Sequence, residues 1–114
     1  MIPKKCNNLY DELCQTSSAY FSMPLDECGP IGAELLLCLE AALTILEKKH
    51  LEPSGKDFQE SLGNILHLST RLRGFMLAEV ANDLRDSLDM NGEGRLAIVN
   101  DCMSLVQTAK TFVA

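Results

Sequence analysis

The run IGAELLLCLEAALTIL, residues 31–46, decides the fold that we expect for this chain. Its apolar residues recur at steps of three and four, which is the spacing of a helical face. At ~100° per residue these side chains cover an arc of roughly 180°, whereas a helix that faces one core usually needs about 100°. We therefore predict a helix that is apolar on more than one side. The run is shorter than the ~20 residues that a bilayer span requires, so we expect no membrane partner.

The same spacing continues along the chain, and no segment shows the sustained alternation of a strand, which predicts an all-α fold. We expect a small antiparallel bundle of three main helices at residues 30–51, 54–88 and 95–112, plus a short N-terminal helix. Pro30 suits the first position of a helix, and Ser54 suits an N-cap. A turn rich in glycine separates the last two helices.

The predicted helix at residues 54–88 is unusually long. It would measure on the order of 50 Å, against about 30 Å for each of the other two. Gly74 lies near its centre, where a glycine either kinks a helix or lets another backbone approach closely. Either the helix breaks at Gly74, or it is continuous and another chain covers part of its apolar stripe.

The first part of the chain differs in composition from the rest. Leu9 and Leu13 mark a short helix, and a segment rich in serine, proline and glycine follows it. We expect residues 1–29 to form an N-terminal arm and linker, and residues 30–114 to form the helical bundle. The whole is one domain, because 114 residues support a single core.

Charge and cysteine content exclude several classes of function. The chain carries 16 Asp plus Glu against 10 Lys plus Arg, a formal net charge of -6. Such a molecule repels polyanions, so we expect no direct binding to nucleic acid or to anionic membranes. The five cysteines are an odd number without a C-x-x-C pair, and no secretory signal precedes them. This pattern indicates reduced thiols in a cytoplasmic protein.

Few residues could carry chemistry. Asp89, Asn91 and Glu93 copy the first three ligand positions of a calcium-binding EF-hand loop, but the twelfth position is Asn100, where calcium needs a carboxylate. The two histidines do not have zinc-ligand spacing, and no nucleophile elbow or phosphate-binding loop is present. We therefore expect a non-enzymatic protein without a cofactor and without a bound metal.

The surplus of apolar helical surface indicates a protein partner, a second copy of the chain in a two-fold homodimer, or both. The alternative is that the helix containing residues 31–46 is the central helix of a tight bundle. For the interface we predict the side of that helix least able to share its main stripe, together with aromatic and Met residues of the linker. These residues are Leu36, Leu37, Leu43, Tyr20, Phe21 and Met23. The alternative for the linker residues is that they cap the bundle.

In its size, its acidity and its apolar run at residues 31–46, the chain resembles the small all-helical antiactivators of bacterial quorum sensing. The resemblance implies a dimeric or dimer-contacting protein that binds the ligand-binding domain of a LuxR-type transcription factor. It implies further that the protein blocks dimerisation or DNA binding of that factor. Secretion chaperones and phage-encoded inhibitors share these gross features, and a helical ligand- or metal-sensing module is a further alternative.

Overall fold

The computed structural model describes residues 6–113, and the regular elements of this part of the chain are helices without any strand. They are α1 (Leu9–Phe21), a single 3-10 turn η1 (Leu25–Glu27), α2 (Gly29–Lys48), α3 (Lys56–Leu72), α4 (Phe75–Ser87) and α5 (Gly92–Lys110). The predicted all-α class is confirmed. The predicted number of main helices is wrong, because four helices rather than three follow α1.

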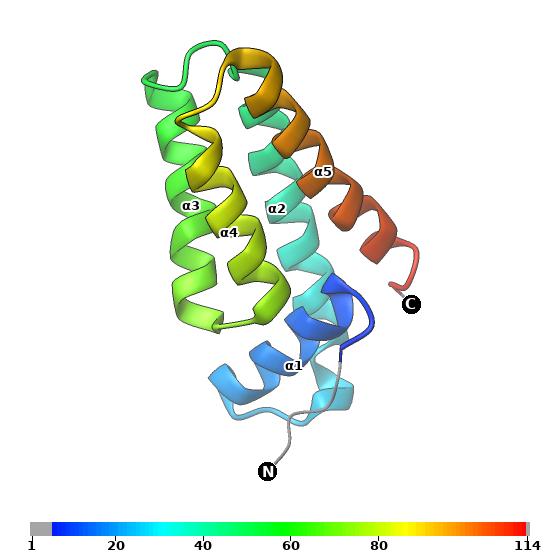
Figure 1. Cartoon of the computed structure of the whole chain (residues 1–114). Helices are drawn as coiled ribbons and strands as arrows, with labels where there is room; N and C mark the ends of the chain where they lie inside the picture. Colours follow the sequence, from blue (N-terminus) through cyan, green and yellow to red (C-terminus); the bar gives the residue numbers. More distant parts are fainter. Residues whose placement is uncertain (1–5, 114) are drawn as a thin grey trace.

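The helix α2 is the central element of the bundle. It contacts α1, α3 and α5, and Figure 1 shows it running along the molecule between α3 and α5, with α4 packed in front. The helix α1 lies across the end of the bundle at which α3 and α4 are joined. The core is almost entirely aliphatic; its largest fully buried side chains are those of Phe58, Leu9, Leu13, Leu36, Leu39, Leu43, Leu46, Ile65, Leu77, Leu84, Val99 and Val106.

The helix α1 belongs to this same core. Leu9 and Leu13 are completely buried in it. Side chains of α1 pack directly on the backbone of α2 at Gly32, where an added Cβ atom would lie 2.6 Å from the Sγ atom of Cys14. The predicted boundary at residue 29 therefore marks a change of composition but no interruption of the packing.

By length and composition alone, α2 could cross a membrane. It has 20 residues and a mean hydropathy of 1.6 over its most apolar window. The core helix of a folded bundle passes the same test, and α2 buries Gly32, Leu36, Leu39, Ala42, Leu43 and Leu46 against its neighbours. Its central position thus accounts for one side of its wide apolar arc.

Of the two alternatives for residues 54–88, a continuous helix and a break at Gly74, the structure has the break, because the chain reverses at Arg73 and Gly74. Arg73 ends α3 in the left-handed region, with φ at 57°, and its N–H donates to the carbonyl of Ser69 at 2.9 Å. Gly74 then begins α4 with an extended backbone. The two halves of the long apolar stripe fold against each other as a helical hairpin (Figure 1), so each half faces the core without help from another chain.

The place of this reversal is set by Glu12 of α1, whose side chain is almost completely buried. Its Oε1 accepts the backbone N–H of Met76, and its Oε2 accepts that of Leu77, each at 2.9 Å. The first turn of a helix leaves such N–H groups without helical partners, and the helix dipole favours a negative charge there. Gly74 leaves room for the carboxylate, since a Cβ atom at that position would lie 2.5 Å from Oε2.

At the opposite end of the bundle, the buried side chain of Arg95 joins two chain reversals. Its Nη1 donates to the carbonyl of His50, and its Nη2 donates to the carbonyl of Met90 at 2.7 Å. The first carbonyl lies in the loop after α2, and the second lies in the turn before α5. One guanidinium group therefore provides a hydrogen-bond donor to a backbone carbonyl in each of the two loops.

The contact between Glu12 and Gly74 can be tested by a double-mutant cycle in urea unfolding. We expect Glu12→Ala to lower the free energy of unfolding by about 3 kcal/mol, because one buried and one partly buried N–H group lose their acceptor. We expect Gly74→Ala to cost about 1 to 3 kcal/mol, because the added Cβ atom displaces that carboxylate. When Glu12 is already alanine, Gly74→Ala should cost at least about 1 kcal/mol less. Strictly additive losses would mean that the two residues act independently.

Candidate protein-binding surface

Two of the three leucines predicted as contact residues on α2 were assigned wrongly. Leu36 and Leu43 are completely buried in the core. The physical reason is that α1, α3 and α5 all pack against α2 and together cover most of its apolar arc. Leu37 lies outside the covered part and is 53% exposed. Of these three leucines, only Leu37 is therefore accessible on the surface of a single chain.

The predicted aromatic residues lie at the end of α1 and are accessible. Tyr20 is 46% exposed and Phe21 is 52% exposed, while Met23 is half-buried. The helix stops directly after them, because Ser22 adopts the left-handed conformation with φ at 54°. The two rings meet edge to face, with their centroids 4.9 Å apart. They form a small ordered aromatic pair on the surface of the bundle.

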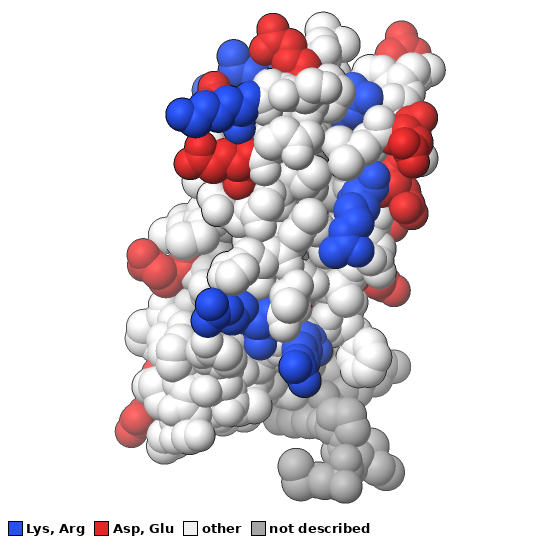
Figure 2. All heavy atoms as spheres, turned by 90° about the vertical axis from the view of Figure 1, so that its left-hand side faces the viewer, with Lys and Arg blue, Asp and Glu red and all other residues white. Residues whose placement is uncertain are grey.

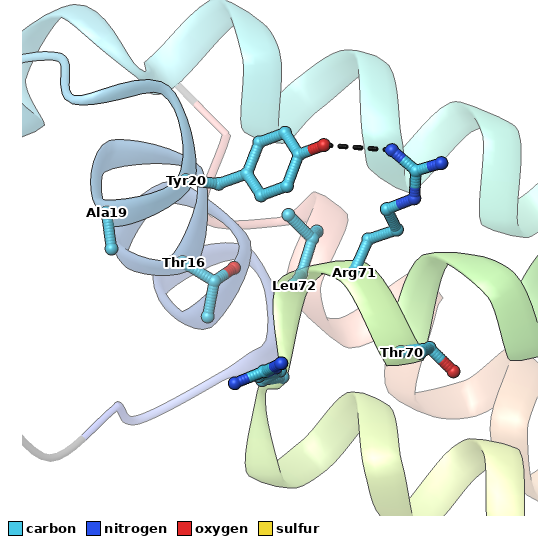
Figure 3. Close-up of a pocket in the computed structure, with 7 residues that line it drawn as sticks. Thr16, Ala19, Tyr20, Thr70, Arg71 and Leu72 are labelled. Atoms are coloured by element: carbon cyan, nitrogen blue, oxygen red, sulfur yellow. Dashed lines mark hydrogen bonds between the residues drawn. The ribbon is translucent and has the colours of Figure 1, made fainter.

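Beside this pair, a groove of about 540 Å³ separates the C-terminal ends of α1 and α3. We call it the α1–α3 groove; it is lined by Thr16, Ala19, Tyr20, Thr70, Arg71, Leu72 and Arg73. Figure 3 shows Tyr20 reaching from α1 toward Arg71 on α3, with Leu72 between them. The Nη1 atom of Arg71 donates to the hydroxyl of Tyr20 at 3.0 Å, which fixes both side chains across the groove.

The aromatic residues of this protein are distributed in an unusual way. The chain has two Tyr, four Phe and no Trp, yet Phe58 alone among these is completely buried. Phe75 is 82% exposed and follows Arg73 by two residues, at the start of α4. The end of α1 and the turn between α3 and α4 lie at the same end of the bundle (Figure 1). Three exposed aromatic residues, Tyr20, Phe21 and Phe75, thus belong to one end of the molecule.

Basic side chains accompany these rings. Arg71 and Arg73 are both exposed and form one wall of the groove. Figure 2, which looks onto the left-hand side of Figure 1, shows basic groups in the lower half of this face, surrounded mostly by uncharged surface. The sequence pattern did not single out these two arginines, because basic and acidic residues that alternate along a helix are typical of a solvated surface.

The loop that resembled an EF-hand does not have the conformation of an EF-hand loop. The helix α5 begins at Gly92, inside the expected loop, so the later ligand positions lie on a regular helix. Asn91 is the N-cap of that helix, and its Oδ1 accepts the N–H of Gly94 at 2.7 Å. Within residues 6–113, Asp89, Asn91 and Glu93 do not belong to any group of three acidic, His or Cys side chains that could hold a metal ion.

The cysteines differ in their accessibility. Cys14, Cys28 and Cys102 are buried, Cys38 is exposed, and no disulfide joins two cysteines within residues 6–113. Burial raises the pKa of the Cys102 thiol from its ordinary value of 9.0 to about 12, and the nearby charges of Asp83 and Asp101 add to the effect. Because the thiolate is the reactive form of cysteine, Cys102 is chemically inert near neutral pH.

Comparison of the chain with models of protein families, with curated proteins and with solved structures found no match.

The raised pKa of Cys102 predicts a loss of stability in alkali. Above pH 9.0 the thiol ionises in the unfolded chain while it stays protonated in the fold, so the unfolded chain binds fewer protons and becomes relatively more favourable. We expect the free energy of unfolding to fall by roughly 1 kcal/mol per pH unit from this group, from about pH 9 until the folded thiol also ionises near pH 12.

The measurement is urea unfolding under reducing conditions between about pH 8 and pH 10.5. Cys102→Ala should reduce the alkaline slope, and the matched substitution at the exposed Cys38 should leave it unchanged. Some slope should persist in Cys102→Ala, because burial also raises the pKa values of Tyr10 and Cys14. An identical slope in the wild type and in Cys102→Ala would contradict the prediction.

Proposed function

We propose that this protein is a non-enzymatic regulatory protein that binds another protein through the α1–α3 groove and the aromatic residues beside it. The observation that supports this most strongly is the exposure of Tyr20, Phe21 and Phe75 at one end of a bundle with an aliphatic core. A buried aromatic side chain removes 150–250 Å² from water, so a half-exposed ring forgoes on the order of 2 kcal/mol. A partner that covers these rings would recover that free energy.

The composition of the surface also favours protein recognition. Tyrosine and arginine dominate the residues that contribute most to measured interfaces, and phenylalanine is enriched there as well. The bond between Arg71 and Tyr20 and the edge-to-face contact with Phe21 hold the rings in place before binding. Rigid side chains lose little conformational entropy when a partner arrives, which increases the affinity.

The chemistry of the groove specifies the kind of partner. An apolar pocket on the partner would accept the aromatic rings of this chain. Carboxylates or carbonyl groups at the rim of that pocket would pair with Arg71 and Arg73. Consistent with the resemblance to quorum-sensing antiactivators, we propose the ligand-binding domain of a LuxR-type transcription factor as the first candidate. The chain would then act by blocking dimerisation or DNA binding of that factor. A secretion chaperone or a phage-encoded inhibitor would use the same surface on a different partner.

The experiment is co-purification of the tagged chain with such a domain, followed by titration of the pair. Phe21→Glu should weaken binding by at least about 30-fold, because a charge would be buried among apolar groups. Phe112→Glu is a matched control, since Phe112 is 56% exposed but lies beyond α5. Equal losses in both variants, or no loss in Phe21→Glu, would exclude the groove. Circular dichroism of each variant checks that the helices persist.

The role of Arg71 can be tested separately through ionic strength. If it pairs with acidic groups of the partner, Arg71→Glu should weaken binding about tenfold or more and should reduce the dependence of the affinity on salt. Arg85→Glu, at an exposed position of α4 away from the groove, makes the same change of net charge. A similar loss in both variants would indicate that only the overall charge matters.

A further inference from the structure

The outward face of α2 carries a second surface, which the proposed partner binding does not use. Its accessible side chains are spaced by three and four residues along the helix and span about 21 Å. We call this set the α2 stripe; it consists of Glu34, Leu37, Cys38, Ala41, Thr44, Ile45 and Lys48. Its middle is apolar, since Leu37 is 53% and Ile45 is 39% exposed. The hydroxyl of Thr44 is already bonded to the carbonyl of Glu40 at 2.8 Å, which leaves its methyl group as the accessible part.

We infer that two copies of this chain pair through the α2 stripe, with their α2 helices antiparallel and Ala41 on the two-fold axis. The stripe is arranged symmetrically about Ala41. At ~100° per residue, its members lie within about 60° on either side of that residue. Positions equally distant from Ala41 along the chain carry matching chemistry: Leu37 matches Ile45, and Cys38 matches Thr44. A small residue at the centre lets the two helices approach closely.

The charges of the stripe select the antiparallel arrangement. Glu34 lies seven residues before Ala41 and Lys48 seven residues after it, and both are exposed. Within residues 6–113, neither side chain makes a hydrogen bond or an ion pair. In the antiparallel pair each Glu34 faces Lys48 of the other copy, and symmetry makes this contact twice. A parallel pair would instead place like charges opposite each other.

A neighbouring acidic residue is already neutralised and does not oppose this pairing. Glu40 accepts hydrogen bonds from Lys110 and Gln107 of α5, each at 2.7 Å, and these bonds hold the pKa of its carboxyl below the ordinary value. The α2 stripe itself carries one negative charge, at Glu34, and one positive charge, at Lys48, so its net charge is zero. The stripe is apolar, self-complementary in charge and open to solvent, which are the properties of an interface between identical chains.

A cysteine at position 41 gives a direct test of the register. Packed helices lie 8–10 Å apart, so two Ala41 Cα atoms on the axis would be separated by roughly 3.4 to 5.4 Å, which overlaps the range of a disulfide. In a Cys38→Ser background, Ala41→Cys should form a covalent dimer rapidly under mild oxidation. Glu47→Cys, exposed on α2 but outside the stripe, is the matched control and should stay mostly monomeric. Native Cys38 should not cross-link to its copy, because the two would lie about 9 Å apart along the helices.

Charge reversal tests the pairing without a covalent bond. Glu34→Lys should weaken the dimer about tenfold in sedimentation equilibrium, because two attractive contacts become repulsive. Lys48→Glu should have a similar effect, and the variant with both changes should recover an affinity within about threefold of the wild type. Phe21→Glu should leave the dimer intact, so failure of this inference is distinguishable from failure of the proposed partner binding.

Four results would overturn the inference. The first is a chain that remains monomeric at submillimolar concentration. The second is a charge exchange that does not restore pairing, and the third is cross-linking of Glu47→Cys as fast as that of Ala41→Cys. A different protein captured on the stripe of a monomeric chain would also exclude pairing between copies.

Discussion

The carboxylate of Glu12, enclosed between α1 and the first turn of α4, is the interaction on which the rest of the structure depends. The Glu12 side chain is almost completely buried. It accepts hydrogen bonds from two backbone N–H groups that have no helical partner at the start of α4. In doing so it fixes where α3 ends, where α4 begins and where α1 crosses the bundle. The α1–α3 groove exists because these three constraints coincide at one end of the molecule.

The helix α2 shows how one apolar sequence can serve two purposes. Its inner side is enclosed by α1, α3 and α5 and holds the core together. Its outer side is still apolar in the middle and charged at the ends, and it is exposed in a single chain. The surplus of apolar surface apparent in the sequence is therefore divided between a satisfied core and an accessible stripe. The aromatic end of the molecule is a separate surface that involves different helices.

The sequence predicted the features that depend on local periodicity. The helical class, the apolar α2 and the accessibility of Leu37, Tyr20 and Phe21 follow from spacing and from residue type. The sequence left open whether the helix breaks at Gly74, because a glycine within a helical pattern is also compatible with a continuous helix; Glu12, far away in the chain, decides between the two. The burial of Leu36 and Leu43 depends on how many helices surround α2, which periodicity does not reveal. Arg71 and Arg73 were missed because only the fold places them beside the aromatic pair.

The nearly aliphatic interior has a spectroscopic consequence. With no tryptophan in the chain, the intrinsic ultraviolet fluorescence comes from two tyrosines, and Tyr20 is one of them. Its hydroxyl lies against Arg71, on the surface and not in the core, so we expect its emission to change when a partner occupies the groove. Tyr10 lies elsewhere, with its hydroxyl directed at the carbonyl of Gly29. The molecule thus carries a natural optical reporter at the place where we propose that it meets its target.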